Sequence, residues 1–132
     1  MSRLMSVAFT EQAVVERRKT VTRRRNWWRD KNGRRILHAG DRLTLCRKVM
    51  GRKPGEPLVR LAEVEVVDVR SETLALLLID RTYGATEVER EGFPGMPPVD
   101  FVDQFFVQAQ GIQPADSITR IEWRYLDEVG AS

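Results

Sequence analysis

A chain of 132 residues in which 42% of the side chains are hydrophobic has the length and apolar content of one globular domain with one core. Charged residues make up 31% of it, but apolar residues occur along the whole chain, which argues against general disorder. Apolar runs stay far below the ~20 residues of a membrane helix, and residues 1–7 do not resemble a secretory signal, so a cytoplasmic protein with no membrane partner is expected.

The net charge of +3 is distributed unevenly. Residues 17–35 contain ten Lys or Arg and a single acid, Asp30, so this segment carries +9 and the remainder −6. A dense basic segment on an acidic body favours a polyanionic partner, with a solvated run of charge as the plainer alternative. Trp27 and Trp28 lie in the same segment, and aromatic rings beside arginine stack on unpaired bases, so nucleic acid is favoured. At most one tryptophan is expected to stack, and the other to lie in the core.

The first third of the chain predicts a strand, a helix and a second strand. Residues 7–9 suit a short strand, and Thr10 suits the N-cap of a helix that runs to about Glu16. The β-branched residues 20–22 suit a strand at a sheet edge. The apolar pattern is then lost over residues 25–40, where turn signals predict a basic loop.

The middle of the chain predicts two more strands. Residues 43–49 favour a strand in which Cys46, the single cysteine, is a buried and unreactive thiol. Residues 51–57 are typical of a hairpin connection. Apolar and charged residues then alternate over residues 58–69, and a slip at Val66-Val67 predicts a β-bulge where the strand bends.

The last third predicts a helix and a closing strand. Residues 74–79 fit a buried strand or a helical turn, because periodicity does not separate the two. An amphipathic helix is expected after Pro98, ending near Gly111. Residues 118–126 alternate strictly, which predicts a strand with its aromatic residues on the core face.

Together these elements predict an α+β fold. Strands of uneven length, short helices and the lack of a βαβ repeat indicate a small mixed β-barrel with two or three short helices packed on it. No linker or internal repeat is evident, so residues 1–132 are expected to form a single domain with its core at about residues 7–126.

Common catalytic and cofactor motifs are missing. One histidine, His38, and one cysteine do not make a Cys/His metal cage, and the chain has neither a GxxxxGK[ST] phosphate loop nor GxGxxG. His38 is interpreted as a loop residue. No metal and no cofactor are expected.

Three short motifs in a fixed order carry more information. They are the segment 18–24 (RKTVTRR), the turn Gly40-Asp41 and the segment 91–93 (EGF), which precede the closing strand. Their order resembles the ASCH family, named for activating signal cointegrator homology, over roughly residues 7–125. The resemblance implies a PUA-like β-barrel whose face and adjacent cleft take RNA or nucleobases.

One branch of small ASCH proteins removes the acetyl group from N4-acetylcytidine with a lysine, a threonine and a glutamate. By motif position the resemblance implies Lys19, Thr22 and Glu91 for these catalytic roles, with other nearby acids open for the third: Glu87 and Glu89. Lys19 and Thr22 are three residues apart and converge only if the chain turns between them. The alternative interpretation is that the three residues have no catalytic role: the lysine is solvated, the threonine belongs to a strand and the acid ends a helix.

The chemistry of the trio depends on the lysine. A threonine hydroxyl needs a base, and a lysine serves as one when its pKa falls from about 10.4 toward ~7–8. Repulsion from Arg17, Arg18 and Arg23 would lower that pKa, whereas an ionised Glu91 would raise it. Arg17 also occupies a place where the family often has glycine, so a turn that needs a positive φ is in question there.

The leading hypothesis is therefore a nucleic-acid-binding domain, with RNA as the favoured partner and a modified nucleoside as an alternative ligand. The expected binding residues are Arg18, Lys19, Arg23, Arg24, Arg25, Trp27 and Trp28. The alternative is an amidohydrolase acting on N4-acetylcytidine-like nucleosides. A third hypothesis is a docking domain whose basic loop binds an acidic protein.

Overall fold

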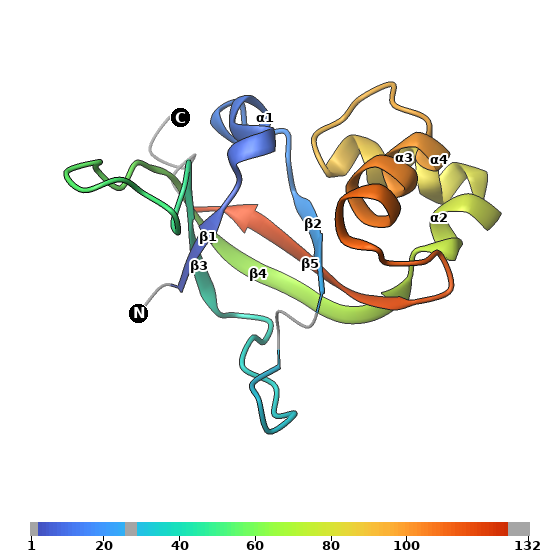
Figure 1. Ribbon diagram of the computed structural model, residues 1–132, viewed down its shortest axis with the longest axis horizontal. Helices are drawn as coiled ribbons and strands as arrows, with labels where there is room; N and C mark the ends of the chain where they lie inside the picture. The colour runs from blue at the N-terminus through green and yellow to red at the C-terminus, as the bar shows by residue number, and fades with distance from the viewer. Residues whose placement is uncertain (1–2, 26–28, 127–132) are drawn as a thin grey trace.

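A computed structural model describes residues 3–25 and 29–126, so Trp27 and Trp28 lie outside the described residues. The described strands are β1 (Arg3–Ser6), β2 (Val21–Arg24), β3 (Arg42–Cys46), β4 (Arg60–Thr73) and β5 (Ser117–Tyr125). The helices are α1 (Glu11–Val15), α2 (Ala75–Ile79), α3 (Arg81–Arg90) and α4 (Pro98–Val102), with a 3-10 turn η1 (Ala8–Thr10) and a π-helical turn η2 (Asp103–Gln108). Figure 1 shows the strands as one curved layer beside a group of helices.

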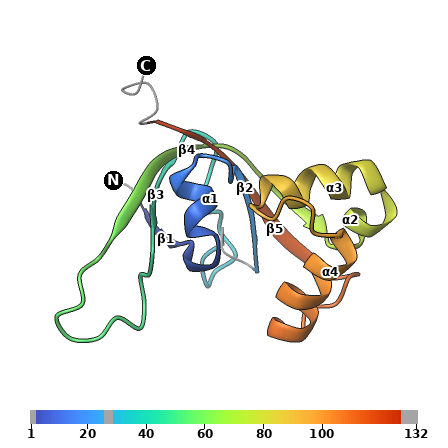
Figure 2. The same cartoon turned by 90° about the horizontal axis from the view of Figure 1, so that it is seen from above.

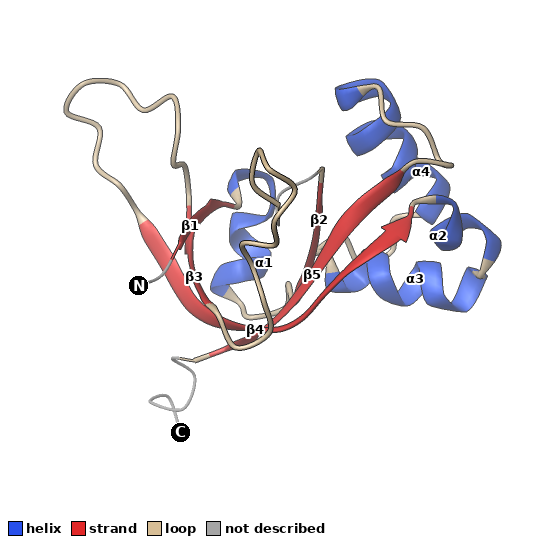
Figure 3. Ribbon diagram, turned by 90° about the horizontal axis from the view of Figure 1, so that it is seen from below, coloured by secondary structure: helices blue, strands red, loops and turns tan. Residues whose placement is uncertain are grey.

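The strands form one mixed sheet in the order β1-β3-β4-β5-β2. β1 runs parallel to β3 and the other pairs are antiparallel. The sheet curls into a half-barrel that holds α1 in its concave side (Figure 2), whereas α2, α3 and α4 gather beside the far ends of β4 and β5 (Figure 3). The predicted α+β fold with a mixed barrel is confirmed, with four helices among the described residues instead of two or three.

The long strand β4 shapes the curl. Its register against β5 shifts between Val66 and Asp68, which confirms the predicted bulge. The turn at Gly40-Asp41 holds this position, because Gly40 N donates to Val66 O at 2.8 Å and Val66 N donates to Asp41 O at 2.8 Å. A bulge adds twist and bends the strand, so the sheet curves at the same point where the turn enters β3.

Two apolar clusters fill the fold where one core was expected. The barrel cluster is Met5, Val7, Val14, Leu37, Leu43, Leu45, Ala62, Val64, Val66, Ile121, Trp123 and Tyr125. The helical cluster is Leu74, Leu77, Val88, Phe101, Val102, Phe106, Ile112 and Ile118. β5 contributes to both, so one strand joins the two clusters. Cys46 is a buried free thiol, as predicted, and burial raises its pKa.

Three sequence predictions near the chain start and middle were wrong or incomplete. The first strand is Arg3–Ser6 instead of residues 7–9, and Phe9 stands 89% exposed on the turn that follows it. The ambiguous segment 74–79 forms α2, and α3 was missed entirely. The sequence of α3 lacks an apolar stripe because its inner face carries a buried glycine and a buried glutamate, Gly84 and Glu87.

Gly84 lets α3 pack directly on α2. A Cβ atom placed there would lie 2.1 Å from the carbonyl oxygen of Leu77, which is far inside contact distance. We expect Gly84→Ala to lower the free energy of unfolding by about 1–3 kcal/mol through overpacking, although alanine favours helices. Urea denaturation would measure the change. Thr86→Ala, at an exposed position of α3, is the control and should stay within about 0.5 kcal/mol of the wild type; equal effects would contradict this account of the helix contact.

Candidate functional site

The chain reverses between α1 and β2 through a left-handed residue. Arg17 has φ 63°, while its N–H donates to Val14 O and Arg18 N–H donates to Ala13 O, the pattern of a Schellman helix end. The turn that favours glycine is therefore kept with arginine in place. The Arg17 side chain supports it by donating to Val14 O at 2.9 Å and by lying 5.1 Å from the ring centre of Tyr125.

This turn directs Lys19 into the protein. Trp123 Nε1 and the Tyr125 hydroxyl both donate to Lys19 O, which fixes the backbone two residues ahead of β2. The Lys19 Nζ donates to Glu91 O at 2.6 Å and to Glu91 Oε1 at 3.3 Å, and both side chains are nearly fully buried. Because Lys19 precedes the strand, the alternation that would separate it from Thr22 does not apply.

Of the three candidate glutamates, only Glu91 lies beside Lys19. It follows the last turn of α3, where Gly92 takes φ 106° against α1 and so brings the carboxylate toward the barrel. Glu87 is fully buried in other ion pairs, and Glu89 is exposed. The residue implied by motif position is therefore the one that the fold brings to Lys19.

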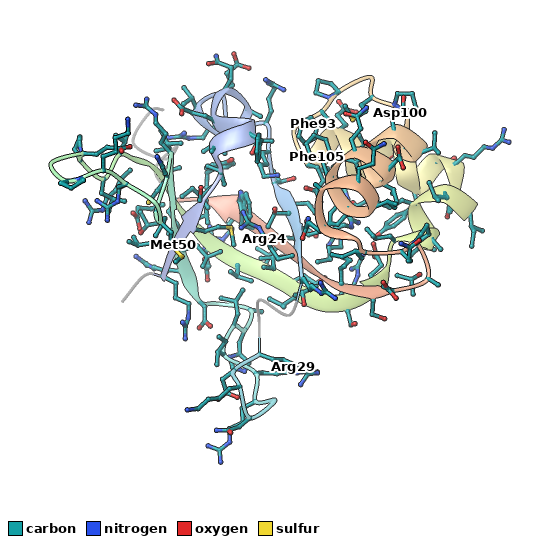
Figure 4. All side chains as sticks on the ribbon, in the orientation of Figure 1. Arg24, Arg29, Met50, Phe93, Asp100 and Phe105 are labelled. Atoms are coloured by element: carbon teal, nitrogen blue, oxygen red, sulfur yellow. The ribbon has the colours of Figure 1, made fainter. Side chains whose placement is uncertain are left out.

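A cavity of about 680 Å³ opens where the barrel meets the helical layer. Its floor is polar and comes from the barrel side and the end of α3: the buried residues Lys19, Thr22, Arg23 and Glu91, with the more exposed Arg24 and Arg25 at the rim. Its helical wall is mainly aromatic and includes Phe93, Phe101, Phe105 and Phe106. Figure 4 shows Phe93 and Phe105 on the helical layer and Arg24 on the barrel. The exposed Phe9 lines the same cavity from the turn after β1, together with Ala8 and the buried Val7.

At the floor of the cavity, Arg23 is the centre of a buried ion network. Its side chain is 0% exposed, and its guanidinium donates to three carboxylates: Glu72 at 2.8 Å, Glu91 at 3.0 Å and Glu87. Arg120, also buried, donates to Glu87 through Nε and Nη2. A buried charge is tolerated when it is paired and hydrogen-bonded, so this network keeps three buried glutamates next to the cavity.

Burial lowers the pKa of Lys19, and the cations Arg24 and Arg23 lower it further, while Glu91 raises it. The sequence prediction attributed this shift to Arg17, Arg18 and Arg23, but the loss of water around the ammonium is the larger cause. Because the pKa is lowered, a larger fraction of Lys19 is in the neutral amine form, which is the form that accepts a proton.

The predicted binding residues occupy different environments. Arg18 is exposed and pairs with Glu16 at 2.6 Å. Arg24 is half-buried and donates to Ser6 O at 2.6 Å, and Arg25 is exposed at the rim of the cavity. Arg23 was expected to contact nucleic acid from the surface, but the structure uses its donors internally in the ion network.

Part of the predicted basic loop forms a compact hairpin. Arg29 and Arg35 make an isolated antiparallel bridge, and the Asp30 carboxylate accepts the N–H groups of Asn32 and Arg34. Figure 4 shows Arg29 on this hairpin, which projects from the body of the protein. Its exposed cations therefore extend the positive surface beyond Arg25.

Within residues 3–25 and 29–126, no cluster of three His, Cys, Asp or Glu side chains could hold a metal ion. His38 is exposed, with Nδ1 3.8 Å from the Asp41 carboxylate at the turn into β3. Among the helices described, none has the length and apolar character needed to cross a membrane.

Comparison with solved structures gives the fold a name. A structure of an ASCH domain from Lactobacillus crispatus JV V101 matches with a TM-score of 0.56 and 10% identity, covering 94% of this chain and 79% of that one. The fold is ASCH-like. Protein EF3133 from Enterococcus faecalis V583, of the family model DUF984, matches with a TM-score of 0.66 and 13% identity, covering 96% and 80% of the two chains. No family model and no curated protein matches the sequence.

The aromatic wall of this ASCH-like fold was missed from the sequence. Phe101 and Phe105 are four residues apart, and the sequence pattern placed them in the expected amphipathic helix without giving them a role in a cavity. The ring centres of Phe93 and Phe105 lie 4.8 Å apart, and those of Phe101 and Phe105 lie 5.6 Å apart. The available signal was the number of phenylalanines, which exceeds what one face of so short a helix needs.

Glu87 gives the ASCH-like fold a measurable response to acid. Its pKa falls from 4.5 to about 2, because Arg120 and Arg23 stabilise the carboxylate more than burial destabilises it. We expect Glu87→Gln to lower the free energy of unfolding at pH 7 by about 3–5 kcal/mol, since two buried arginines lose a partner. A depressed pKa stabilises the folded state above about pH 4.5, and that stabilisation is lost as the pH falls toward 2.

Urea denaturation between pH 7 and pH 2.5 would test this prediction. The difference in the free energy of unfolding between the wild type and Glu87→Gln should become smaller below pH 4.5. Glu89→Gln, on the exposed side of α3, is the matched control and should change stability by less than about 0.5 kcal/mol. If the difference in unfolding free energy stayed constant with pH, the ionised Glu87 carboxylate would not be the source of the stabilisation.

Proposed function

We propose that this protein binds nucleic acid, RNA in the first instance, by taking one nucleobase into the cavity between barrel and helices. The observation that carries the proposal is the division of the cavity into an aromatic wall and a charged floor. Its volume of about 680 Å³ lies in the usual range of sites that enclose a small organic group.

The aromatic wall suits a flat ring. Stacking of a base on an aromatic side chain contributes about 1–3 kcal/mol and tolerates any base, because every base has a π face. Phe93 and Phe105 supply such faces from the helical layer. Phe9, which also lines the cavity and is 89% exposed, would lose contact with water when a ring enters.

The charged floor suits the polar edge of a base. Lys19 offers donors, the Glu91 carboxylate offers acceptors, and the Thr22 hydroxyl offers both. Reading of an extruded base uses hydrogen bonds of this kind to its Watson–Crick edge. Arg24 and Arg25 at the rim, with the cations of the basic hairpin beyond them, provide attraction for the phosphate backbone.

Substitution of one wall residue tests the stacking. We expect Phe105→Leu to weaken binding of single-stranded RNA by about tenfold, because leucine fills the space without an aromatic face. Phe105→Tyr, which keeps the ring, should bind within about threefold of the wild type. Titration of labelled RNA oligonucleotides by fluorescence anisotropy, at several salt concentrations, measures both variants.

Equal losses in the leucine and tyrosine variants would contradict stacking at this wall. Binding that is absent for every oligonucleotide, or that does not weaken as salt rises, would contradict the nucleic-acid proposal itself, because phosphate contacts release counterions. An equal response to an acidic polypeptide would favour the protein-docking alternative.

A second candidate function is hydrolysis of an N4-acylated cytidine. The observation that favours it is a buried lysine with a lowered pKa beside Glu91, in a cavity that Thr22 also lines. Thr22 Oγ1 would attack the acyl carbon while its proton passes to the Lys19 amine. The carbon–nitrogen bond then breaks, the leaving cytidine amine takes up that proton, and water releases the acid from the threonine ester.

Removal of one hydroxyl group distinguishes the hydrolase function from the binding function. We expect Thr22→Val to abolish release of cytidine from N4-acetylcytidine, since valine keeps the shape but removes the nucleophile. Chromatography of the products measures turnover. Thr44→Val, at a buried threonine of β3 outside the cavity, is the matched control and should retain turnover. Activity that survives in Thr22→Val would remove this threonine from the mechanism. If the wild type showed no turnover of N4-acetylcytidine, only the proposed binding function would remain.

A further inference from the structure

Arg25 lies between two cavities. It lines the rim of the large cavity, and it also lines a second cavity of about 280 Å³ together with Ile112, Asp116 and Ser117. Arg25 directly follows β2, and its side chain is exposed. A single cation therefore borders both cavities, where it could bind the phosphate that joins two neighbouring nucleotides.

The second cavity differs from the first in chemistry. The described residues that line it, Arg25, Ile112, Asp116 and Ser117, include no aromatic ring on which a base could stack. The Asp116 carboxylate accepts the N–H of Gln113 at 2.8 Å through Oδ2, which fixes the carboxylate at the start of β5. Ser117, the next residue in the chain, lines the same cavity. A fixed carboxylate accepts hydrogen bonds from sugar hydroxyls, as acidic residues do for ribose in dinucleotide sites.

A carboxylate also restricts which part of a nucleotide fits there. It repels a phosphate, so the phosphate belongs at the guanidinium of Arg25 and the sugar at Asp116 and Ser117. The 2′-hydroxyl is both donor and acceptor, and it is the group that distinguishes RNA from DNA at a protein site. The arrangement of the three side chains thus matches a ribose and its adjoining phosphate.

We propose that the second cavity receives the ribose of the nucleotide next to the one whose base enters the large cavity, with Arg25 on the phosphate between them. This inference rests on the proposed binding of a nucleobase and deepens it. The ligand is then a strand of at least two ribonucleotides instead of a free nucleoside, and Asp116 provides the preference for ribose over deoxyribose.

Calorimetric titration tests the proposal with defined probes: the four nucleosides, the ribodinucleotides ApA, CpC, GpG and UpU, and their deoxy counterparts. For the base that binds best, the ribodinucleotide should bind about tenfold more tightly than the nucleoside, and about fivefold more tightly than the deoxydinucleotide. Ser117→Phe should fill the second cavity and remove the advantage of the dinucleotide while the nucleoside affinity stays unchanged.

Two further variants keep the test decisive. Ser71→Phe, at an exposed serine of β4, is the matched control and should behave as the wild type. Asp116→Asn retains an oxygen that can accept the Gln113 N–H, so it should fold even where Ser117→Phe does not, and it should reduce the ribose preference to about twofold or less.

The outcomes separate this inference from the function on which it rests. Nucleoside binding without any gain for the dinucleotide, or a gain that Ser117→Phe leaves intact, overturns the second site alone. A ribose preference that persists in Asp116→Asn overturns the role of that carboxylate. If neither nucleoside nor dinucleotide binds, the proposed nucleobase site fails, and the second site fails with it.

Discussion

The buried guanidinium of Arg23 is the interaction on which the rest of the site depends. It joins carboxylates from β4, from α3 and from the end of α3, so the strand that carries Thr22 and the helix that carries Glu91 meet around one charge. The fully planar donor set of arginine allows this, because it can satisfy several acceptors at once. Without such a centre, three buried glutamates would repel one another, and the helical layer would not close on the barrel at this point.

Backbone geometry then decides which side chains reach the cavity. The left-handed residue Arg17 follows α1, and the left-handed Gly92 packs against Thr10 and Ala13. Together these two turns bring Lys19 and Glu91 to each other. Both turns are local features, yet their effect is to join residues 72 positions apart in the chain. The pairing of Lys19 with Glu91 is therefore built by chain reversals, because neither residue lies within a strand or a helix.

The sequence predicted those parts of the fold that regular patterns encode. Alternation revealed β4, β5 and the bulge at Val66, because each strand has one face on the core. It did not reveal α3, because Glu87 occupies a core position that only an ion network makes tolerable. Lys19, Thr22 and Glu91 were identified through a family resemblance. Their spacing in the sequence alone does not indicate that they lie together. The burial of Arg23 was not predicted, because its carboxylate partners are distant in the sequence.

The position of the cavity has a consequence for cooperativity. Val7 belongs to the barrel cluster, Phe101 and Phe106 belong to the helical cluster, and all three line the same hollow. A molecule held there would contact both clusters at once and would bind only when they are docked together. By mass action such a molecule opposes every partial opening in which the helices separate from the barrel. A molecule in the cavity therefore adds contacts between the barrel cluster and the helical cluster, which share the strand β5.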